Sequence, residues 1–308
     1  MRAEILAHEP EPRRAPDAPA AADPAVAPEP PRAAAAPDAI APEAIATDAD
    51  EAPVPARSFE PASALDKVTS AALWAAGLGW LIPALGGLTV VYQLVPSHRI
   101  DWAGRLYCKV QIALTGSRWR AEVHPKVDPA RQYVFAQNHT NHFDHVLCYN
   151  ATPHFKQGLE LESHFRYPFY GWFMKARGTV PVKKGQRGQT SELTERIGRE
   201  IAEGRSILSF PEGSRTRTGR VRPFRTGIFF IARDLGVPVV PVAVTGAFDL
   251  MRPGSPIIRA GNELTVWVEE PIETAGATDD EIPALAERAR AAVARRVDAY
   301  WAAREEQR

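Results

Sequence analysis

The densest group of chemically capable side chains lies at residues 137–145, which read Gln-Asn-His-Thr-Asn-His-Phe-Asp-His. Apolar residues typical of a strand precede this segment, and apolar residues compatible with a helix follow it. α/β proteins place ligand sites where a strand end leads into a helix. If the chain bends here, the carboxylate of Asp144 can hold one ring nitrogen of His139. The other nitrogen is then free to act as a general base.

Other chemistries compete for the same segment. His139, His142 and His145 are spaced by three residues and could bind a metal together with Asp144, although the segment lacks a His-Glu-x-x-His pattern and a supporting pair of cysteines. A thiol site at Cys148 would need a polar setting, and this cysteine lies in an apolar run. Taken alone, the segment is also compatible with ordinary loop histidines.

A second polar segment, residues 207–219, reads Ile-Leu-Ser-Phe-Pro-Glu-Gly-Ser-Arg-Thr-Arg-Thr-Gly. Gly213 would let a ligand approach the backbone closely. Arg215 and Arg217 could hold a phosphate by forked hydrogen bonds. An ion pair with Glu212 in the turn is the structural alternative for Arg215.

The chain around this second segment is strongly basic. From Lys175 to Arg233 there are 14 Lys or Arg residues against 5 Asp or Glu residues. This surplus fits a solvated basic face, or an anion site with a rim that faces a membrane. Nucleic acid is disfavoured because aromatic residues are not interleaved with the basic ones as a stacking platform.

The elements that would position both segments alternate between strand-like and helix-like patterns. Strands are predicted at 119–124, 133–137, 179–182, 206–210, 237–244 and 264–269, and helices at 190–203 and 279–304. We therefore expect an α/β domain at residues 99–308, with a mixed, mostly parallel sheet flanked by helices.

Composition divides the 308 residues into unlike parts. Residues 1–60 contain 12 of the 28 prolines and carry 5 basic against 12 acidic residues, so a net charge of −7 is balanced by +7 on the remainder. We expect a disordered tail over residues 1–62, because so few large apolar side chains cannot offset the entropy of ordering. The two cysteines exclude a disulfide framework and a four-cysteine zinc ribbon, and they fit the reducing cytoplasmic side.

Residues 68–95 form an uncharged run that is long enough to enter a membrane. Four glycines and Pro83 interrupt its helical pattern. We therefore expect membrane-associated apolar helices at residues 63–98, arranged as a hairpin that dips into one leaflet, although one spanning helix fits as well. A buried hairpin in a soluble core is the remaining alternative.

Together these segments resemble the glycerophospholipid acyltransferases of the 1-acyl-sn-glycerol-3-phosphate O-acyltransferase (PlsC) type. The likeness covers roughly residues 100–270 and keeps the family's order of blocks. His139 and Asp144 are similar to its catalytic His-x4-Asp motif, and residues 210–215 to its Phe-Pro-Glu-Gly-Thr-Arg signature, with Ser214 in place of Thr. Residues 178–183, 224–227 and 239–244 resemble three further blocks, although the first ends in Lys183 where the family has Asp-Arg.

The resemblance implies a mechanism. His139, oriented by Asp144, takes the proton from a free glycerol hydroxyl, whose oxygen attacks the thioester of acyl-CoA or acyl carrier protein directly. No acyl-enzyme is implied, in agreement with the absence of a Gly-x-Ser-x-Gly motif. The residues implied to bind substrate are Glu212, Gly213, Ser214, Arg215, Lys183 and Arg187.

The expected activity is the conversion of lysophosphatidic acid to phosphatidic acid by a membrane-associated enzyme with its active site on the cytoplasmic side. No metal or organic cofactor is expected, and the partners are the lyso-lipid, the acyl donor and the membrane, without nucleic acid. Two alternatives stay open: an acyltransferase for another lysophospholipid or a lyso-ornithine lipid, and a catalytically silent membrane-binding module.

Overall fold

The computed structural model describes residues 52–183 and 190–307. Its strands are β1 (Arg118–Val123), β2 (Val134–Gln137), β3 (Lys156–Leu161), β4 (Val180–Val182), β5 (Ser206–Ser209), β6 (Val239–Thr245) and β7 (Glu263–Val268). Its α-helices are α1 (Ala64–Leu94), α2 (Asp101–Ala113), α3 (Asp144–Ala151), α4 (Tyr170–Arg177), α5 (Thr190–Ala202), α6 (Gly227–Asp234), α7 (Ala247–Leu250) and α8 (Ile282–Glu305). Short 3-10 turns lie at Arg57–Phe59, Ser97–Ile100, Glu162–Arg166 and Asp279–Glu281.

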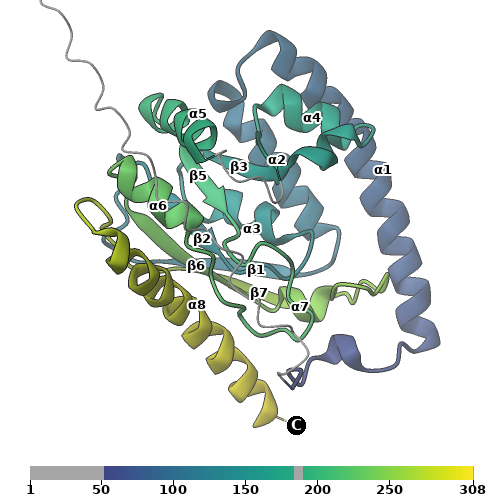
Figure 1. Cartoon of the computed structure of the whole chain (residues 1–308). Coiled ribbons are helices and arrows are strands. Elements are labelled where there is room, and N and C mark those ends of the chain that lie inside the picture. The colour runs from purple at the N-terminus through teal and green to yellow at the C-terminus, as the bar shows by residue number, and fades with distance from the viewer. Residues whose placement is uncertain (1–51, 184–189, 308) are drawn as a thin grey trace, which may run out of the picture. The chain divides into compact units, whose positions relative to one another are not determined.

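The strands form one seven-stranded sheet in the order β1-β7-β6-β2-β5-β3-β4 (Figure 1). Every neighbouring pair is parallel except β6 and β7, which are antiparallel. The central strand β2 is buried along its whole length, as expected of a strand covered on both faces. The expectation of a mixed, mostly parallel sheet flanked by helices is confirmed.

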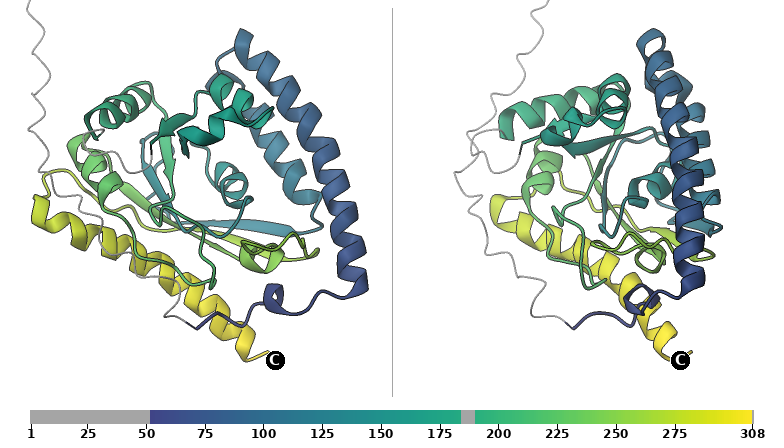
Figure 2. Two further views of the ribbon diagram at one scale, coloured as in Figure 1. Left: turned by 45° about the vertical axis from the view of Figure 1, so that its right-hand side comes forward. Right: turned by 90° about the vertical axis from the view of Figure 1, so that its right-hand side faces the viewer.

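Helices cover both faces of this sheet, and each face has its own apolar core. One core joins the sheet to α5, α6 and α8 and includes Phe229, Ile197 and Val293. The other joins it to α1, α2 and α3 and includes Phe135 and Leu147. Figure 2 shows α8 along one side of the sheet and α1 on the other. The histidine segment at 137–145 and the polar segment at 207–219 meet at one edge of this sheet, between the two helix layers.

The six predicted strands and the helix at 190–203 are present within one or two residues of the expected bounds. The helix predicted at 279–304 begins with a 3-10 turn, so α8 itself starts at Ile282. The sequence pattern missed β3, because this strand begins with Lys156 and contains Gly158, two residues that are poor strand signals. Lys156 is nevertheless fully buried, and its ammonium group lies 4.9 Å from the centre of the Phe135 ring.

The apolar segment forms one continuous helix, α1. The hairpin of two short helices expected within residues 63–98 is not observed, whereas the single helix that fitted the sequence equally well is. α1 has 31 residues and contains Pro83. It begins with a capping box in which Ser63 and Asp66 satisfy each other's backbone N–H groups. Packing against α2 and α4 outweighs the cost of the interrupting residues. By length and composition α1 could cross a membrane. The helix that packs back along it is α2, which starts after the predicted segment of residues 63–98.

The predicted tail is longer than the structure allows. Residues 1–51 lie outside the described residues, but residues 52–60 form a strap that packs on the domain. Val54 and Ala56 are buried in the core, and the Val54 N–H donates to the carbonyl of Thr218 at 2.9 Å. The Arg57 N–H donates to Asp249, which is itself fully buried. The buried valine and these two hydrogen bonds to distant parts of the chain explain why residues 52–60 are packed despite their proline-rich sequence.

Candidate active site

The site lies where three adjacent parallel strands end. β2 runs into the histidine segment, β5 into the Phe-Pro-Glu-Gly corner at 210–213, and β6 into α7. These three strands are neighbours in the sheet, so their carboxyl ends meet at one edge. This is the position at which open α/β sheets bind ligands.

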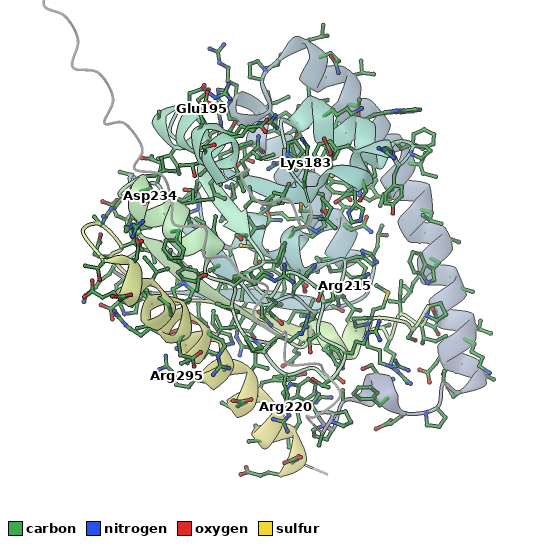
Figure 3. The ribbon with its side chains drawn as sticks, in the orientation of Figure 1. Lys183, Glu195, Arg215, Arg220, Asp234 and Arg295 are labelled. Atoms are coloured by element: carbon green, nitrogen blue, oxygen red, sulfur yellow. The ribbon has the colours of Figure 1, made fainter. Side chains whose placement is uncertain are left out.

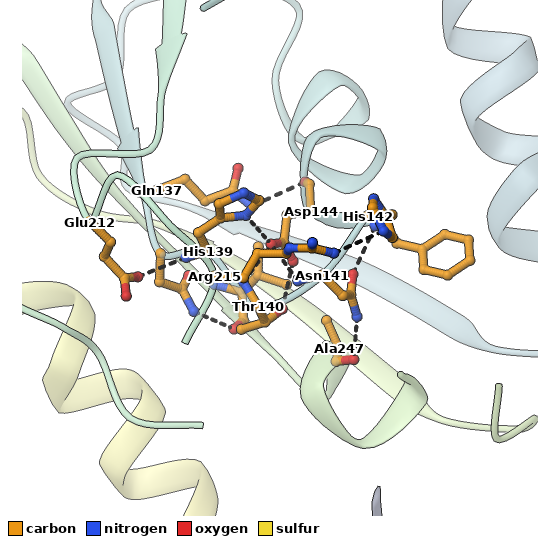
Figure 4. A network of polar contacts seen from close by, with 12 residues as sticks. Gln137, His139, Thr140, Asn141, His142, Asp144, Glu212, Arg215 and Ala247 are labelled. Atoms are coloured by element: carbon orange, nitrogen blue, oxygen red, sulfur yellow. Dashed lines mark hydrogen bonds and ion pairs between the residues drawn. The ribbon is translucent and has the colours of Figure 1, made fainter. Parts of the chain in front are cut away.

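The structure brings His139 and Asp144 together. The Nδ1 atom of His139 lies 2.8 Å from Oδ2 of Asp144, as Figure 4 shows. Asp144 is the first residue of α3 and is fully buried. About a quarter of the His139 side chain, 24%, remains exposed. The histidine therefore faces the outside while its partner does not.

A clamp of hydrogen bonds fixes the Asp144 carboxylate. The backbone N–H of Thr140 donates to Oδ2 at 2.5 Å and that of Asn141 at 2.8 Å. The hydroxyl of Thr140 donates to Oδ1 at 2.6 Å. An aspartate carboxylate only accepts, so the histidine Nδ1 carries the proton that points at it. Nε2 is left with a free lone pair, the arrangement that a general base requires.

The ring and backbone of His139 are held from the second polar segment. The ring stacks on Phe210, with centroids 4.2 Å apart and planes 24° apart. The His139 carbonyl accepts a hydrogen bond of 2.8 Å from the N–H of Thr216. Its N–H donates to Oε1 of Glu212 at 2.7 Å. The two motifs are thus joined on both sides of the histidine.

Glu212 points inward, although the resemblance implies that it binds substrate. It is buried, with 2% exposed, and its second oxygen accepts the N–H of Arg222 at 3.1 Å. Burial raises the pKa of Glu212 to about 8, against the lowering effect of these two backbone bonds. Gly213 follows with a φ of 70°, a conformation that favours glycine. Glu212 therefore ties the backbones of 139 and 222 together.

Arg215 lies near His139 and contacts the neighbouring His142 (Figure 4). Its Nη1 lies 2.8 Å from Nε2 of His142. Because the guanidinium can only donate, His142 accepts through an unprotonated nitrogen. Burial and the neighbouring Arg215 lower the pKa of His142, which favours that neutral form. Burial lowers the pKa of His145 to about 4.

The other predicted binding residues divide into three cases. Ser214 is exposed and accepts a hydrogen bond from the Arg222 guanidinium. Lys183 is exposed on the chain that leaves β4, on a different element from Arg215, as Figure 3 shows. Arg187 lies outside the described residues.

Two of the competing chemistries concern a metal and the Cys148 thiol. Among residues 52–183 and 190–307, no group of three or more His, Cys, Asp or Glu residues is arranged to hold a metal ion. Cys148 is fully buried, and burial raises the pKa of its thiol to about 11, so it stays protonated at neutral pH.

Sequence reasoning missed the residues that support the site. Asn138 bonds both backbone groups of Val244, with distances of 3.1 Å and 2.7 Å. Asn141 donates to the carbonyls of Ala247 and Met251. Both asparagines are buried. Two asparagines beside a histidine are a sequence signal for such a role, because a buried amide requires hydrogen-bond partners. The sequence could not identify these partners, since they are 106 residues away along the chain.

Residues 120–245 match the model of the family described as Acyltransferase. Over these residues the chain is similar to the acyltransferase family. The match contains both His139 and Arg215, together with β2, β5 and β6, so it covers the whole site described above.

Individual proteins with similar sequences agree with this likeness. The chain is 32% identical over 139 residues to "1-acyl-sn-glycerol-3-phosphate acyltransferase BAT2, chloroplastic" of Brassica napus, covering 45% of this chain and 40% of that protein. It is 27% identical over 188 residues to the 1-acyl-sn-glycerol-3-phosphate acyltransferase of Haemophilus influenzae, covering 60% and 74%. The alignment thus spans about two fifths of the plant protein.

A solved structure shows the same fold. The crystal structure of the 1-acyl-sn-glycerophosphate (LPA) acyltransferase PlsC from Thermotoga maritima matches with a TM-score of 0.62 at 19% sequence identity. The match covers 76% of this chain and 95% of the Thermotoga protein.

Proposed function

We propose that this protein transfers a fatty acyl group from a thioester donor to the free hydroxyl of 1-acyl-sn-glycerol 3-phosphate. The hydrogen bond between His139 and the clamped Asp144 carries the proposal. It leaves Nε2 of a partly exposed histidine without a partner among the described residues. Relatives named as 1-acyl-sn-glycerol-3-phosphate acyltransferases support the choice of acceptor.

The reaction is a direct transfer. Nε2 of His139 accepts the hydroxyl proton of the acceptor while the hydroxyl oxygen bonds to the thioester carbonyl carbon. When the carbon–sulfur bond breaks, the imidazolium returns the proton to the departing sulfur. The products are an ester and a thiol, and the histidine is regenerated. Asp144 stabilises the imidazolium that exists between these two proton transfers, in the manner of a triad carboxylate.

The acceptor phosphate is assigned to Arg215. Its guanidinium is held beside the histidine by His142, on the α1 side of the site (Figure 4). The forked donors of an arginine fit phosphate oxygens. Arg217 is exposed on the same loop and adds positive charge.

The surface of α1 supports a membrane location. Exposed large apolar side chains on this helix are Leu65, Val68, Trp74, Leu78, Ile82, Val90, Val91 and Leu94. Exposed apolar side chains in this number on one helix favour contact with lipid. A lysophospholipid held in the same bilayer would reach the histidine from the α1 side, and the site would then face the cytoplasm.

The decisive experiment measures thiol release from acyl-CoA and from acyl carrier protein, by the purified protein in vesicles, with a panel of acceptors. Release stimulated by lysophosphatidic acid supports the proposal. Release stimulated only by a phosphate-free lyso-ornithine lipid, or by another lysophospholipid, would change the acceptor and keep the chemistry. No release with any acceptor would refute catalysis and favour a membrane-binding module.

A further inference from the structure

A cavity of about 320 Å³ opens beside the histidine, away from Arg215. Apolar side chains from β3, β4, α5 and α6 make most of its wall, among them Leu159, Leu193 and Ile228. Ile228 belongs to the apolar core formed with α5, α6 and α8, so the cavity lies on the face of the sheet opposite α1 and α2.

Phe210 connects this cavity with the chemistry. It is part of the cavity wall, and its ring is the one that stacks on His139. A group lying in the cavity against Phe210 is therefore one aromatic ring away from the imidazole. The thioester of a bound molecule could reach the base around the edge of this ring.

The cavity has a positive mouth. Three basic residues, Arg225, Lys183 and Arg196, line it against two acidic ones, Glu162 and Glu192, and Arg196 pairs with Glu192. Arg225 and Lys183 are both exposed. Within the described part of the chain neither has an acidic partner. The Arg225 guanidinium lies close against Gly213, since a Cβ atom at that glycine would be 2.7 Å from the guanidinium carbon. The Arg225 backbone N–H donates to the Pro211 carbonyl at 2.9 Å, which fixes where this side chain begins.

The first turn of α6 adds to this positive mouth. Gly227, the first residue of the helix, also lines the cavity. The N-terminus of a helix favours an anion. An unpaired guanidinium beside a helix N-terminus, at the mouth of an apolar cavity, fits an elongated ligand with an apolar or amide-bearing arm and a phosphate.

We propose that this cavity binds the phosphopantetheine arm of the acyl donor, with its phosphate at Arg225. The inference rests on the proposed acyl transfer and adds the direction from which the donor enters. The lyso-lipid comes from the α1 side and meets Arg215. The water-soluble donor comes from the α5–α6 side and meets Arg225, so the two substrates converge on His139 from opposite faces of the sheet (Figures 1 and 2).

The test separates the two substrates kinetically. Arg225→Gln keeps the backbone bond to Pro211 and removes the charge. We expect the KM for acyl-CoA to rise about tenfold, the loss of one charge-assisted hydrogen bond, with the KM for lysophosphatidic acid unchanged. Leu193→Trp, which narrows the cavity, should raise the KM for acyl-CoA of every chain length alike. Arg199→Gln removes the same charge from α5 outside the cavity and is the matched control.

Calorimetric binding of free CoA to the full-length protein gives a readout that does not need turnover. Arg225→Gln should weaken this binding about tenfold, and Arg199→Gln should not. The proposal is overturned by a rise in the acceptor KM alone, by unchanged donor KM and CoA binding, or by a Leu193→Trp variant that only shifts chain-length preference. That last result would place the acyl chain in the cavity. If the wild type binds CoA through Arg225 and yet transfers no acyl group, the proposed function fails and the donor site stands.

Discussion

The floor of the site and its rim are built differently. On the floor, the carboxylates of Asp144 and Glu212 are buried, and each of their oxygens accepts a hydrogen bond from the chain. On the rim, Lys183, Arg217 and Arg225 are exposed, without acidic partners among the described residues. The floor is fixed before any ligand arrives, whereas the rim offers unused donors.

This difference separates two tasks. In the proposed reaction, the fixed imidazole and its carboxylate would serve acyl transfer to any alcohol, because they would act on the hydroxyl proton alone. In the same proposal, the rim groups would hold the parts of the substrates that do not react, and so they would select which substrates bind. Changes to the floor should therefore lower kcat, and changes to the rim should raise KM.

The largest effect is expected from His139→Ala. Removing the base should lower kcat by about 10²–10⁴, the usual contribution of a positioned general base. His124→Ala is the control, since His124 lies at the end of β1, away from the site. The kcat of each variant is measured as the rate of thiol release at saturating concentrations of both substrates. A His139→Ala protein with near-normal kcat would refute the assignment of the base.

Asp144→Asn should follow closely. The amide keeps the shape of the carboxylate but loses the charge that stabilises the imidazolium, and its N–H₂ group faces the donors at 140 and 141. We expect kcat to fall by about 10² or more with little change in either KM. An unchanged kcat would mean that His139 acts without its carboxylate.

Glu212→Gln should alter the pH dependence of stability. The folded pKa of about 8 lies above the ordinary value of 4.5, so the folded protein holds this proton more tightly than the unfolded chain. The stability from Glu212 is complete below pH 4.5 and is lost as the pH rises through 8, by up to about 1.4 kcal/mol per pH unit.

The Gln variant lacks this titration. Urea unfolding, followed by tryptophan fluorescence between pH 6.5 and 8, should show a falling free energy of unfolding for the wild type and a smaller fall for the variant. Parallel curves would show that Glu212 is ionised throughout this range. Glu195→Gln, an exposed change on α5, controls for the loss of one carboxylate.

Arg215→Ala tests the rim on the acceptor side. Losing a charge-assisted bond to the phosphate should raise the KM for lysophosphatidic acid about tenfold or more and leave the KM for the donor unchanged. Arg215→Lys should recover part of the loss, because a point charge replaces the forked donor. Equal effects on both substrates would exclude a phosphate role for Arg215.

The smallest effect is expected at His142. His142→Leu removes the neutral acceptor that holds Arg215, and the KM for the acceptor should rise about fivefold. His142→Gln offers a carbonyl oxygen near the same place and should restore most of the affinity. If Gln and Leu behave alike, His142 does not position Arg215.

The sequence was informative where the signal is local. The strand patterns at 133–137 and 206–210 predicted that His139 and the corner at 213 each follow a strand end. The structure confirms this and shows in addition that the two strands are neighbours in the sheet. Thr140 as a second donor to Asp144, and Glu212 as a link between backbones, depend on how the loops fold in space.

The helix α1 and the strand β3 show the opposite limit. Glycine and proline destabilise a helix wherever they occur, but the sequence does not show which packing contacts offset this destabilisation. For α1 the neighbours are α2 and α4. For β3, the ammonium group of the buried Lys156 lies over the Phe135 ring. These two residues are on strands that are not adjacent in the sheet.

The strap formed by residues 52–60 has a practical consequence for trimming the protein. Val54 lies against Gly219, where an added Cβ atom would be 2.4 Å from the valine side chain, and its backbone holds the carbonyl of Thr218. A shortened gene product that starts at α1 would leave an open hollow beside the loop that carries Thr216 and Arg222. Recombinant versions intended for crystallisation should keep Val54, and an affinity tag belongs upstream of it.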